Sequence, residues 1–401
     1  MKTDVIIIGG GPAGCATALG LNRLGYRVVL CDQAKFPRDK VCGEFISPAA
    51  DPILKRLGVL DRIEALSPKR LKGVAISSYE GEEIVIDYPQ LPGMDARPTS
   101  LSVPRYELDV NFMEQVKQVG VEVREQHKVA EFLFADGNVT GVRGWDENKT
   151  SFTIKAPLVI DAGGRNALSL RKLGLKKKSV GNSKIAMAAH WQGAQIADDY
   201  CYMHVSRPGY TGISSVGRDR ANVVLVVNHQ SMNGEKPDKF YLDAVMRNCH
   251  RRKILQDAEC IESVLSIESL AFSVKPVPCG GLLLVGDATG FIDPFTGEGI
   301  YLSLRSSEIA VEVANQAFEK SDWSNELLKD YEVRRRREFD KKFLLSRIFQ
   351  KLIYSRFFCD QVIEALQRKR ALAETLVGVI GDLLPAQRAV SFKFLLRLLN
   401  A

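Results

Sequence analysis

The sequence predicts an α/β fold that combines a parallel-sheet domain, an inserted antiparallel sheet and a helical C-terminal region. The first sixty residues have the pattern strand, helix, strand, with which parallel sheets begin. Between about residues 182 and 270, short strands follow one another at even spacing with polar turns between them, as in an antiparallel sheet. After residue 323 the pattern is mainly helical.

The opening segment carries the parallel-sheet prediction. A β-branched run over 4–8 stops at Gly9-Gly10-Gly11, and residues 13–24 then have helical composition and apolar spacing. Gly25 ends this helix, and residues 26–32 form a second strand. A parallel pair of strands joined by a helix is therefore expected.

The following elements alternate between the two expected domains. Antiparallel material belongs to the inserted sheet, and the other segments return to the parallel domain. We expect helices over 48–66 and 105–119, a hairpin over 73–88 around Glu80-Gly81-Glu82, and strands over 121–129 and 139–144 separated by the turn at 136–138. Later strands are expected at 185–191, 200–205, 210–216, 222–228 and 282–285, and a helix over 300–318.

Composition excludes several classes of protein. With 45% hydrophobic and 26% charged residues, the chain is globular in type rather than disordered or fibrous. No apolar run reaches the roughly 18 residues of a membrane span, and no secretory signal is recognised. Eight scattered cysteines without a CxxC pair favour neither disulfides nor zinc, and the histidines give no metal spacing. We expect a reducing cytoplasm, with attachment at the inner face of a membrane as the alternative.

A glycine motif follows the first strand. Gly9, Gly11 and Gly14 fit GxGxxG at the start of a helix, where glycines let the backbone approach a pyrophosphate and helix N–H groups attract its charge. Asp32 ends the second strand eighteen residues after Gly14, where an acid can accept hydrogen bonds from a ribose. A Rossmann-like dinucleotide site is favoured over a merely tight turn.

A second block lies almost three hundred residues further on. The buried run 282–285 ends in Gly286-Asp287-Ala288-Thr289-Gly290, followed by Pro294, Phe295, Thr296 and Gly297-Glu298-Gly299-Ile300. Here the chain resembles the flavoprotein superfamily of geranylgeranyl reductases and aromatic-ring hydroxylases, over about residues 1–330. The resemblance implies that Asp287 holds the ribityl chain of FAD and that the Gly299 and Ile300 amides face the flavin, where a helix N-terminus suits the negative charge of the reduced ring.

A third segment, Pro37 to Glu44 followed by Ser47-Pro48, resembles the P-x-x-K-x-C-G-E sequence of the geranylgeranyl reductase-like branch. By that resemblance it lies beside the flavin. Cys42 is then a candidate on the substrate side and Glu44 a candidate proton donor. A packed cysteine and a backbone-capping glutamate are the structural alternatives.

Weaker matches complete the pattern. Arg105 stands where the family places an arginine near the FAD phosphates, with a surface arginine as the alternative. The segment 159–165 resembles the DGxxS block but has Ala-Gly-Gly in place of Asp-Gly. Tyr210 remains where the reductases have a PxxYxWxFP substrate motif, without its tryptophan. The cofactor contacts implied are Gly9, Gly11, Pro12, Ala13, Gly14, Asp32, Cys42, Gly43, Arg105, Val129, Gly286, Asp287, Pro294, Gly297, Gly299 and Ile300, with Tyr210 at the substrate and no metal.

The function implied is that of an FAD-dependent oxidoreductase acting on an apolar small molecule. NAD(P)H or another external reductant would reduce FAD, which would then either reduce a C=C bond or, as a monooxygenase, bind oxygen and oxygenate the substrate. No second glycine fingerprint, redox CxxxxC or halogenase tryptophan-rich segment is found. The alternative from another class is a non-catalytic flavin-fold protein that binds lipid or prenyl groups.

The excess positive charge lies at the C-terminal end. From Lys329 to Ala401 there are 16 Lys and Arg against 8 Asp and Glu, a balance of +8 in a chain whose net charge is +7. Acid-before-base pairs four residues apart around Arg334–Arg337 indicate a solvated helix face. We favour a packed helical cap, with interfacial membrane contact as the alternative and nucleic acid as the least favoured partner.

The expected domains are an FAD-binding domain (1–72, 101–180 and 271–322), a substrate domain (73–100 and 181–270) and a C-terminal helical cap (323–401).

Overall fold

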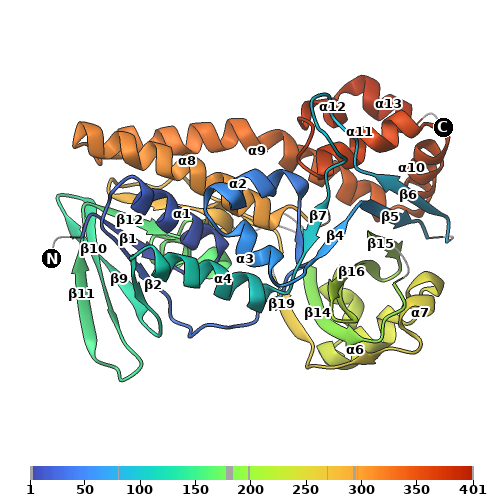
Figure 1. Ribbon diagram of the computed structural model, residues 1–401, viewed down its shortest axis with the longest axis horizontal. Helices are drawn as coiled ribbons and strands as arrows, with labels where there is room; N and C mark the ends of the chain where they lie inside the picture. The colour runs from blue at the N-terminus through green and yellow to red at the C-terminus, as the bar shows by residue number, and fades with distance from the viewer. Residues whose placement is uncertain are drawn as a thin grey trace.

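The computed structural model describes residues 3–79, 81–177, 184–196, 199–268, 270–291, 295 and 297–399. Within them, a parallel sheet lies at one end of the molecule, a larger and mostly antiparallel sheet lies at the other end, and the C-terminal helices run along both (Figure 1). This is the α/β architecture expected from the sequence.

Five parallel strands among the described residues form the first sheet, in the order β21-β12-β1-β2-β8. Except in the edge strand β8, their β-branched and leucine side chains are buried on both faces, as a covered parallel sheet requires. The strands are β1 (Val5–Ile8), β2 (Val28–Cys31), β8 (Glu122–Arg124), β12 (Leu158–Asp161) and β21 (Leu282–Leu284).

Alternate residues of β1 divide the core into two layers. Val5 and Ile7 pack against helices, whereas Ile6 and Ile8 pack against a small antiparallel sheet on the opposite face. The helices are α1 (Pro12–Arg23), α4 (Arg105–Gln118) and α8 (Gly299–Lys320), and the small sheet is β9 (Lys128–Ala135), β10 (Asn138–Trp145) and β11 (Ser151–Lys155).

One expected strand is divided in the structure. The segment 121–129 forms β8, which pairs with β2, and then the start of β9, which pairs with β10. Gln126 lies between them with a φ of 58°, a left-handed conformation that interrupts an extended chain. The prediction of a single strand over 121–129 was therefore wrong.

The second large sheet contains the strands expected in the insertion. β14 (Lys184–Gln192), β17 (Arg220–Asn228), β16 (Gly209–Gly217) and β15 (Tyr200–Ser206) lie side by side, and the 73–88 hairpin extends the sheet through β5 (Gly73–Ser77) and β6 (Glu83–Asp87). β18 (Glu259–Cys260) and β19 (Leu265–Glu268) pair with β14 on its other side. The division into domains at the residue limits given above stays a prediction.

Two helices that we did not expect cover one face of this sheet. α6 (Pro237–Val245) and α7 (Cys249–Leu255) bury Phe240, Tyr241 and Leu255 against Met187 and Leu225. The opposite face, which carries Ala186 and Val224, turns toward the parallel domain.

Short elements connect the two sheets. A small sheet unites β3 (Phe45–Ile46), β7 (Ser100–Ser102) and β4 (Lys69–Leu71), and β13 (Lys176–Lys177) pairs with β20 (Ser273–Val274). The short helices are η1 (Pro48–Ala50), α2 (Asp51–Arg56), α3 (Leu60–Glu64), η2 (Gly164–Asn166), α5 (Leu168–Lys172), η3 (His229–Met232) and η4 (Gly286–Thr289).

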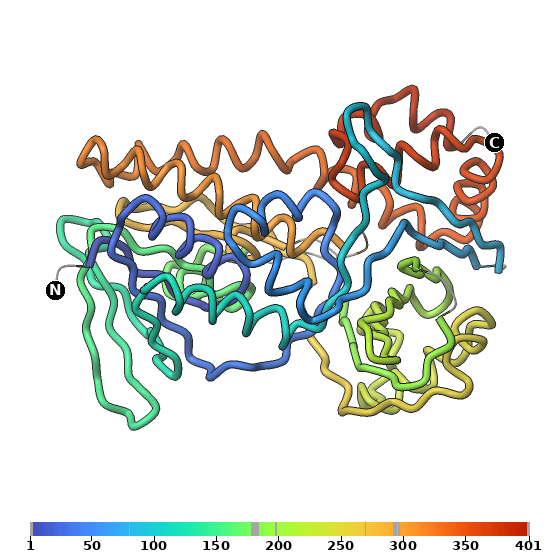
Figure 2. The backbone as a smooth tube through the Cα atoms, in the orientation of Figure 1, coloured from blue at the N-terminus to red at the C-terminus, as the bar shows by residue number. Residues whose placement is uncertain are grey.

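The C-terminal helices pack on both upstream parts. α9 (Asn325–Ile353) runs beside α8, and α10 (Arg356–Arg368), α11 (Arg370–Ile380), α12 (Gln387–Val390) and α13 (Phe392–Leu399) gather beside β5 and β6 (Figures 1 and 2). Leu345, Leu366 and Leu376 share a buried cluster with Val74 and Tyr88. Within the described ranges, each helix is too short or too polar to span a bilayer.

Candidate functional site

The turn between β1 and α1 depends on glycine. Gly9 has a φ of 103°, and a Cβ atom on Gly14 would lie 1.8 Å from the Gly9 carbonyl oxygen, so a larger residue at position 14 would push α1 away from β1. A Cβ on Gly11 would instead point toward the Arg38 guanidinium, 3.7 Å away, at the edge of a cavity. Gly11 precedes the first residue of α1 without supplying a side-chain cap, which leaves this helix end suited to an anion.

Asp32 stands directly after β2 and is buried. Its Oδ2 accepts a hydrogen bond from the Gly10 N–H at 2.6 Å, and its Oδ1 accepts one from the Ala34 N–H at 2.7 Å. A carboxylate has about four acceptor positions, so Asp32 can hold the glycine turn and still accept from a ribose hydroxyl.

Two adjoining cavities meet at the glycine turn. We call them the Asp32 cavity and the Asp287 cavity; Gly11, Lys40 and Ala162 line both. The Asp32 cavity is further lined by Gly9, Arg38, His127, Val129, Asn166 and Arg171, among others. The Asp287 cavity is further lined by Pro12, Ala13, Cys42, Gly43, Arg105, Arg165, Gly297, Gly299 and Ser303, among others. Together they make one elongated site.

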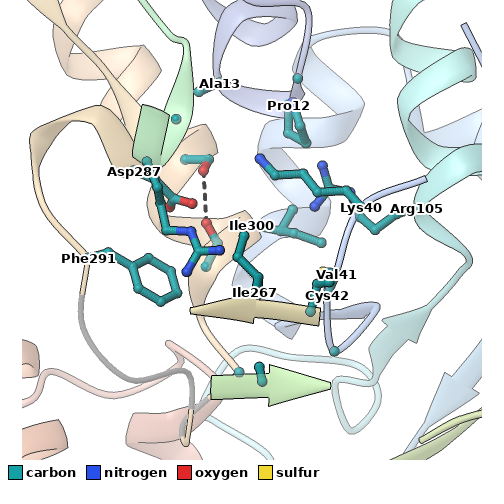
Figure 3. A pocket seen from close by; sticks show the side chains of 18 of the residues that line it. Pro12, Ala13, Lys40, Val41, Cys42, Arg105, Ile267, Asp287, Phe291 and Ile300 are labelled. Atoms are coloured by element: carbon teal, nitrogen blue, oxygen red, sulfur yellow. Dashed lines mark hydrogen bonds between the residues drawn. The ribbon is translucent and has the colours of Figure 1, made fainter. Parts of the chain in front are cut away.

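Polar and apolar groups divide the Asp287 cavity. Figure 3 shows Lys40 and Arg105 near Pro12, with Asp287 and Phe291 across the cavity from them. The apolar lining comes from the larger sheet, from β3, from α8 and from connecting segments: Val41, Phe45, Ala186, Val224, Ile267, Leu270, Phe291 and Ile300. A ligand here would meet both charged and apolar side chains.

Two cations in the cavity were missed by sequence reasoning. The Arg165 guanidinium lies 5.2 Å from the Phe291 ring centroid, and its Nη1 is buried with no hydrogen-bond partner among the described residues. Burial lowers the pKa of Arg165, an effect that Asp287 opposes. Burial also lowers the pKa of Lys40, with help from Arg105 and against the attraction of Asp287. Such poorly compensated donors favour an anionic ligand.

Arg105 is held by an acid on its own helix. Its Nε and Nη2 donate to the two carboxylate oxygens of Asp109, at 3.0 and 2.9 Å, and both side chains are buried. Burial would lower the pKa of Arg105, but Asp109 and then Cys42 outweigh it and raise this pKa. Arg105 therefore enters the cavity as a fixed positive charge.

Cys42 and Gly43 line the Asp287 cavity, whereas Glu44 does not. The Cys42 Sγ accepts a hydrogen bond from the Glu44 N–H at 3.3 Å. One Glu44 oxygen accepts from the backbone N–H of Arg105 at 2.7 Å, and the other lies 2.7 Å from His190 Nε2. Glu44 thus holds the start of α4 rather than facing the cavity.

Several other expected site residues lie outside the lining of the two cavities. Gly14 and Gly286 line neither one and shape the backbone around them; Gly286 has a φ of 60° and donates to Ser306 at 3.2 Å. Tyr210 is buried on β16 with its ring edge-to-face against Phe295, outside the cavity lining. Pro294 lies outside the described residues. No group of three or more potential metal ligands occurs in the described part of the chain.

Comparison with known families decides the cofactor. Residues 2–342 match the family described as FAD binding domain. The chain belongs to this FAD-binding family. The resemblance proposed from the glycine and Gly-Asp motifs is confirmed.

Proteins with related sequences include reductases and halogenases. Digeranylgeranylglycerophospholipid reductase 2 of Methanothermobacter thermautotrophicus is 27% identical over 92% of this chain and 91% of its own. The 1H-pyrrole-2-carbonyl-[peptidyl-carrier protein] chlorinase of Pseudomonas fluorescens is 27% identical over 82% and 79%. A geranylgeranyl bacteriochlorophyll reductase-like crystal structure from Thermoplasma acidophilum superposes with a TM-score of 0.75, at 22% identity over 99% and 96%. The chain is an FAD-dependent oxidoreductase, and the enzymatic interpretation prevails over the non-catalytic one.

The cavities fit FAD as this family implies. FAD is an elongated molecule, and the two cavities join at Gly11. At this junction the start of α1 suits the pyrophosphate of FAD. Asp32 and Val129 would then hold the adenosine half of FAD, and Asp287, Gly299 and Ile300 would hold the flavin half. A Cβ on Gly43 or Gly299 would meet nothing within 4 Å, so both glycines leave room at the cavity wall. The buried Nη1 of Arg165, which finds no hydrogen-bond partner in the described part of the chain, suits the negative charge of the cofactor.

Proposed function

We propose that this enzyme reduces a carbon–carbon double bond in an apolar, isoprenoid-like molecule. The observation that carries the proposal is the apolar wall of the Asp287 cavity, which the inserted sheet contributes through Ala186, Val224 and Ile267. Burial of a hydrocarbon chain against such a wall contributes about 0.8 kcal/mol per CH₂ group. The reductase relative named above, whose name specifies a geranylgeranyl lipid, supports the same substrate class.

The chain supplies binding and a proton, and reduced FAD supplies the hydride equivalent when bound. The Cys42 thiol lies in the cavity wall and is our candidate to protonate the carbon that does not receive the hydride. Asn222 accounts for the placement of Cys42, because its Nδ2 donates to the Cys42 carbonyl at 2.9 Å. An external reductant such as NAD(P)H then restores the two electrons, and solvent restores the proton.

Oxygenation is the second candidate. The similarity of this chain to the chlorinase named above supports it. The absence of the halogenase tryptophan-rich segment argues against halogenation itself. The position of Tyr210, packed behind the apolar wall, is compatible with a supporting role in substrate binding under either chemistry.

An anaerobic reduction experiment separates the two reactions. The holoenzyme is reduced chemically without oxygen and mixed with a phospholipid that carries unsaturated geranylgeranyl chains. For the double-bond reductase, flavin absorbance returns and mass spectrometry finds a gain of two hydrogens per bond. Cys42→Ala should slow this step more than tenfold while flavin reduction stays unchanged. Reoxidation only after oxygen is admitted, with oxygen incorporated into the lipid, would establish oxygenation instead.

We also propose a peripheral membrane contact through the C-terminal helices. Phe357 and Phe358 at the start of α10 are 64% and 40% exposed, and Phe392 at the start of α13 is 77% exposed. Arg356 and Lys393 stand next to them in the sequence. Exposed aromatic residues beside cations suit the surface of an anionic bilayer.

A further inference from the structure

A buried histidine joins the inserted sheet to the cofactor domain. His190 lies on β14, on the same face as Ala186 of the Asp287 cavity, and its side chain is 8% exposed. Its Nε2 lies 2.7 Å from a Glu44 oxygen, and its Nδ1 lies 2.7 Å from a Glu262 oxygen. A neutral imidazole carries one N–H, so only the protonated ring donates to both carboxylates.

The contacts of His190 continue into the cavity wall. The second oxygen of Glu44 accepts from the backbone N–H of Arg105, the first residue of α4, and the Glu44 N–H donates to Cys42 Sγ. Asn222, the cross-strand neighbour of His190, donates to the Cys42 carbonyl. Adjacent residues of β14 and β17 therefore hold the turn at residues 42–44, and two residues of that turn line the cavity.

Four ionisable groups face the imidazole. Glu44 comes from the 42–44 turn, Glu262 from the segment before β19, Arg220 from β17 and Tyr106 from α4, with its ring centroid 6.3 Å away. Burial lowers the pKa of His190, and Arg220 lowers it further. The hydrogen bond and charge of Glu44, together with the charge of Glu262, outweigh both and raise the pKa above its usual value.

We propose that Glu262, His190 and Glu44 form a protonation-dependent latch between the inserted sheet and the 42–44 turn. His190 is a positioning residue in this latch, since it touches neither cavity. Loss of its proton leaves one ring nitrogen without an N–H, so the hydrogen bond to Glu44 and the ion pair with Glu262 cannot both persist, which frees the turn. The Glu262 side chain is 37% exposed and connects the buried ring to solvent. The latch acts on cofactor retention and does not depend on which reaction the flavin performs.

The test follows FAD release from the full-chain holoenzyme between pH 5.5 and 9. Histidine NMR reports the protonation of His190, and the fluorescence of released FAD after dilution gives the dissociation constant. We expect FAD to be held at least fivefold more tightly below the His190 pKa than above it. Glu262→Gln should move the midpoint to lower pH, because it removes a charge that favours the protonated ring. His190→Gln should remove the step.

A matched control comes from the surface. His229 pairs with Glu268 at 3.3 Å, both exposed, so His229→Gln should leave the pH step in place. The proposal is overturned if His190→Gln and Glu262→Gln keep the wild-type step. If His190→Gln fails to fold, the midpoint in Glu262→Gln decides alone, and an unmoved midpoint counts against the latch. Since no turnover is measured, failure here leaves the proposed reduction untouched.

Discussion

The Asp32 carboxylate accepts a hydrogen bond from the backbone N–H of Gly10 at 2.6 Å, which ties the end of β2 to the turn after β1. An acid placed to meet a ribose thus also shapes the backbone that approaches the pyrophosphate. Changes at Asp32 should therefore affect both the fold and the cofactor.

Asp32→Ala should lower FAD affinity and also destabilise the FAD-free protein. It leaves the N–H groups of Gly10 and Ala34 without their acceptor, at a cost of about 2 kcal/mol. Urea unfolding followed by circular dichroism measures the loss, and flavin fluorescence measures affinity. Asp32→Asn keeps an acceptor oxygen, so its stability and its FAD affinity should lie between those of Asp32→Ala and wild type. Equal stability of Asp32→Ala and wild type would contradict the structural half of this prediction.

Asp287→Ala should weaken FAD retention with little effect on folding. Asp287 lines its cavity and is only partly buried, so its removal takes away a ligand contact rather than core packing. We expect the free energy of unfolding without FAD to change by less than about 0.5 kcal/mol. The amount of flavin that stays bound after gel filtration measures the loss of FAD retention. Full flavin occupancy in the variant would show that Asp287 does not hold the cofactor.

Local patterns predicted the cofactor site better than the contacts between domains. Glycine spacing and Asp32 lie within one strand-helix-strand unit, so short-range geometry specifies them. The link between Glu44 and His190 spans 146 residues and forms only when two sheets meet. The sequence alone gives no reason to join His190 to Glu44. Arg165 belongs to the 159–165 motif, but only the three-dimensional structure shows that its buried Nη1 has no hydrogen-bond partner among the residues described.

Helices α6 and α7 were missed for a related reason. They lie between β17 and β18, inside a region whose regular strand spacing we extended through 270. The signals were present: Pro237 stands at the start of α6, and the Asn248 side chain caps α7 by accepting from the N–H groups of His250 and Arg251. In this region the local helix-start signals decide the structure over the repeating strand pattern.

Acid should destabilise the protein through His204. This side chain is fully buried, its Nδ1 lies 2.9 Å from Ser77 Oγ, and its ring stacks on His250. Burial, with Arg251 and His250, lowers the pKa of His204 to about 3. The unfolded chain, with a histidine pKa of about 6.5, binds this proton first, so stability falls as pH drops from about 6.5 toward 3.

One such proton contributes at most about 1.4 kcal/mol per pH unit to that slope. His204→Gln should make the slope shallower between pH 6 and 4, measured by urea unfolding at each pH. His127, which is only partly buried and bonds a backbone carbonyl, provides the matched His127→Gln control. An identical slope in wild type and His204→Gln would rule out this histidine as a source of acid sensitivity.

Removing two exposed phenylalanines should weaken binding to anionic vesicles. Phe357→Ser with Phe392→Ser deletes side chains that are 64% and 77% exposed, and each contributes about 1 kcal/mol if a bilayer buries half of it. We expect at least a tenfold lower partition coefficient in flotation assays with phosphatidylserine vesicles, and binding by the wild type should weaken as salt rises. Val333→Ser is the control, because Val333 is 63% exposed on α9 and lies outside the proposed contact. If the contact depends on these aromatic residues, Val333→Ser should bind the vesicles as tightly as wild type does. If the double variant also binds as tightly as wild type, the membrane role is refuted and α10 to α13 are only a packed cap.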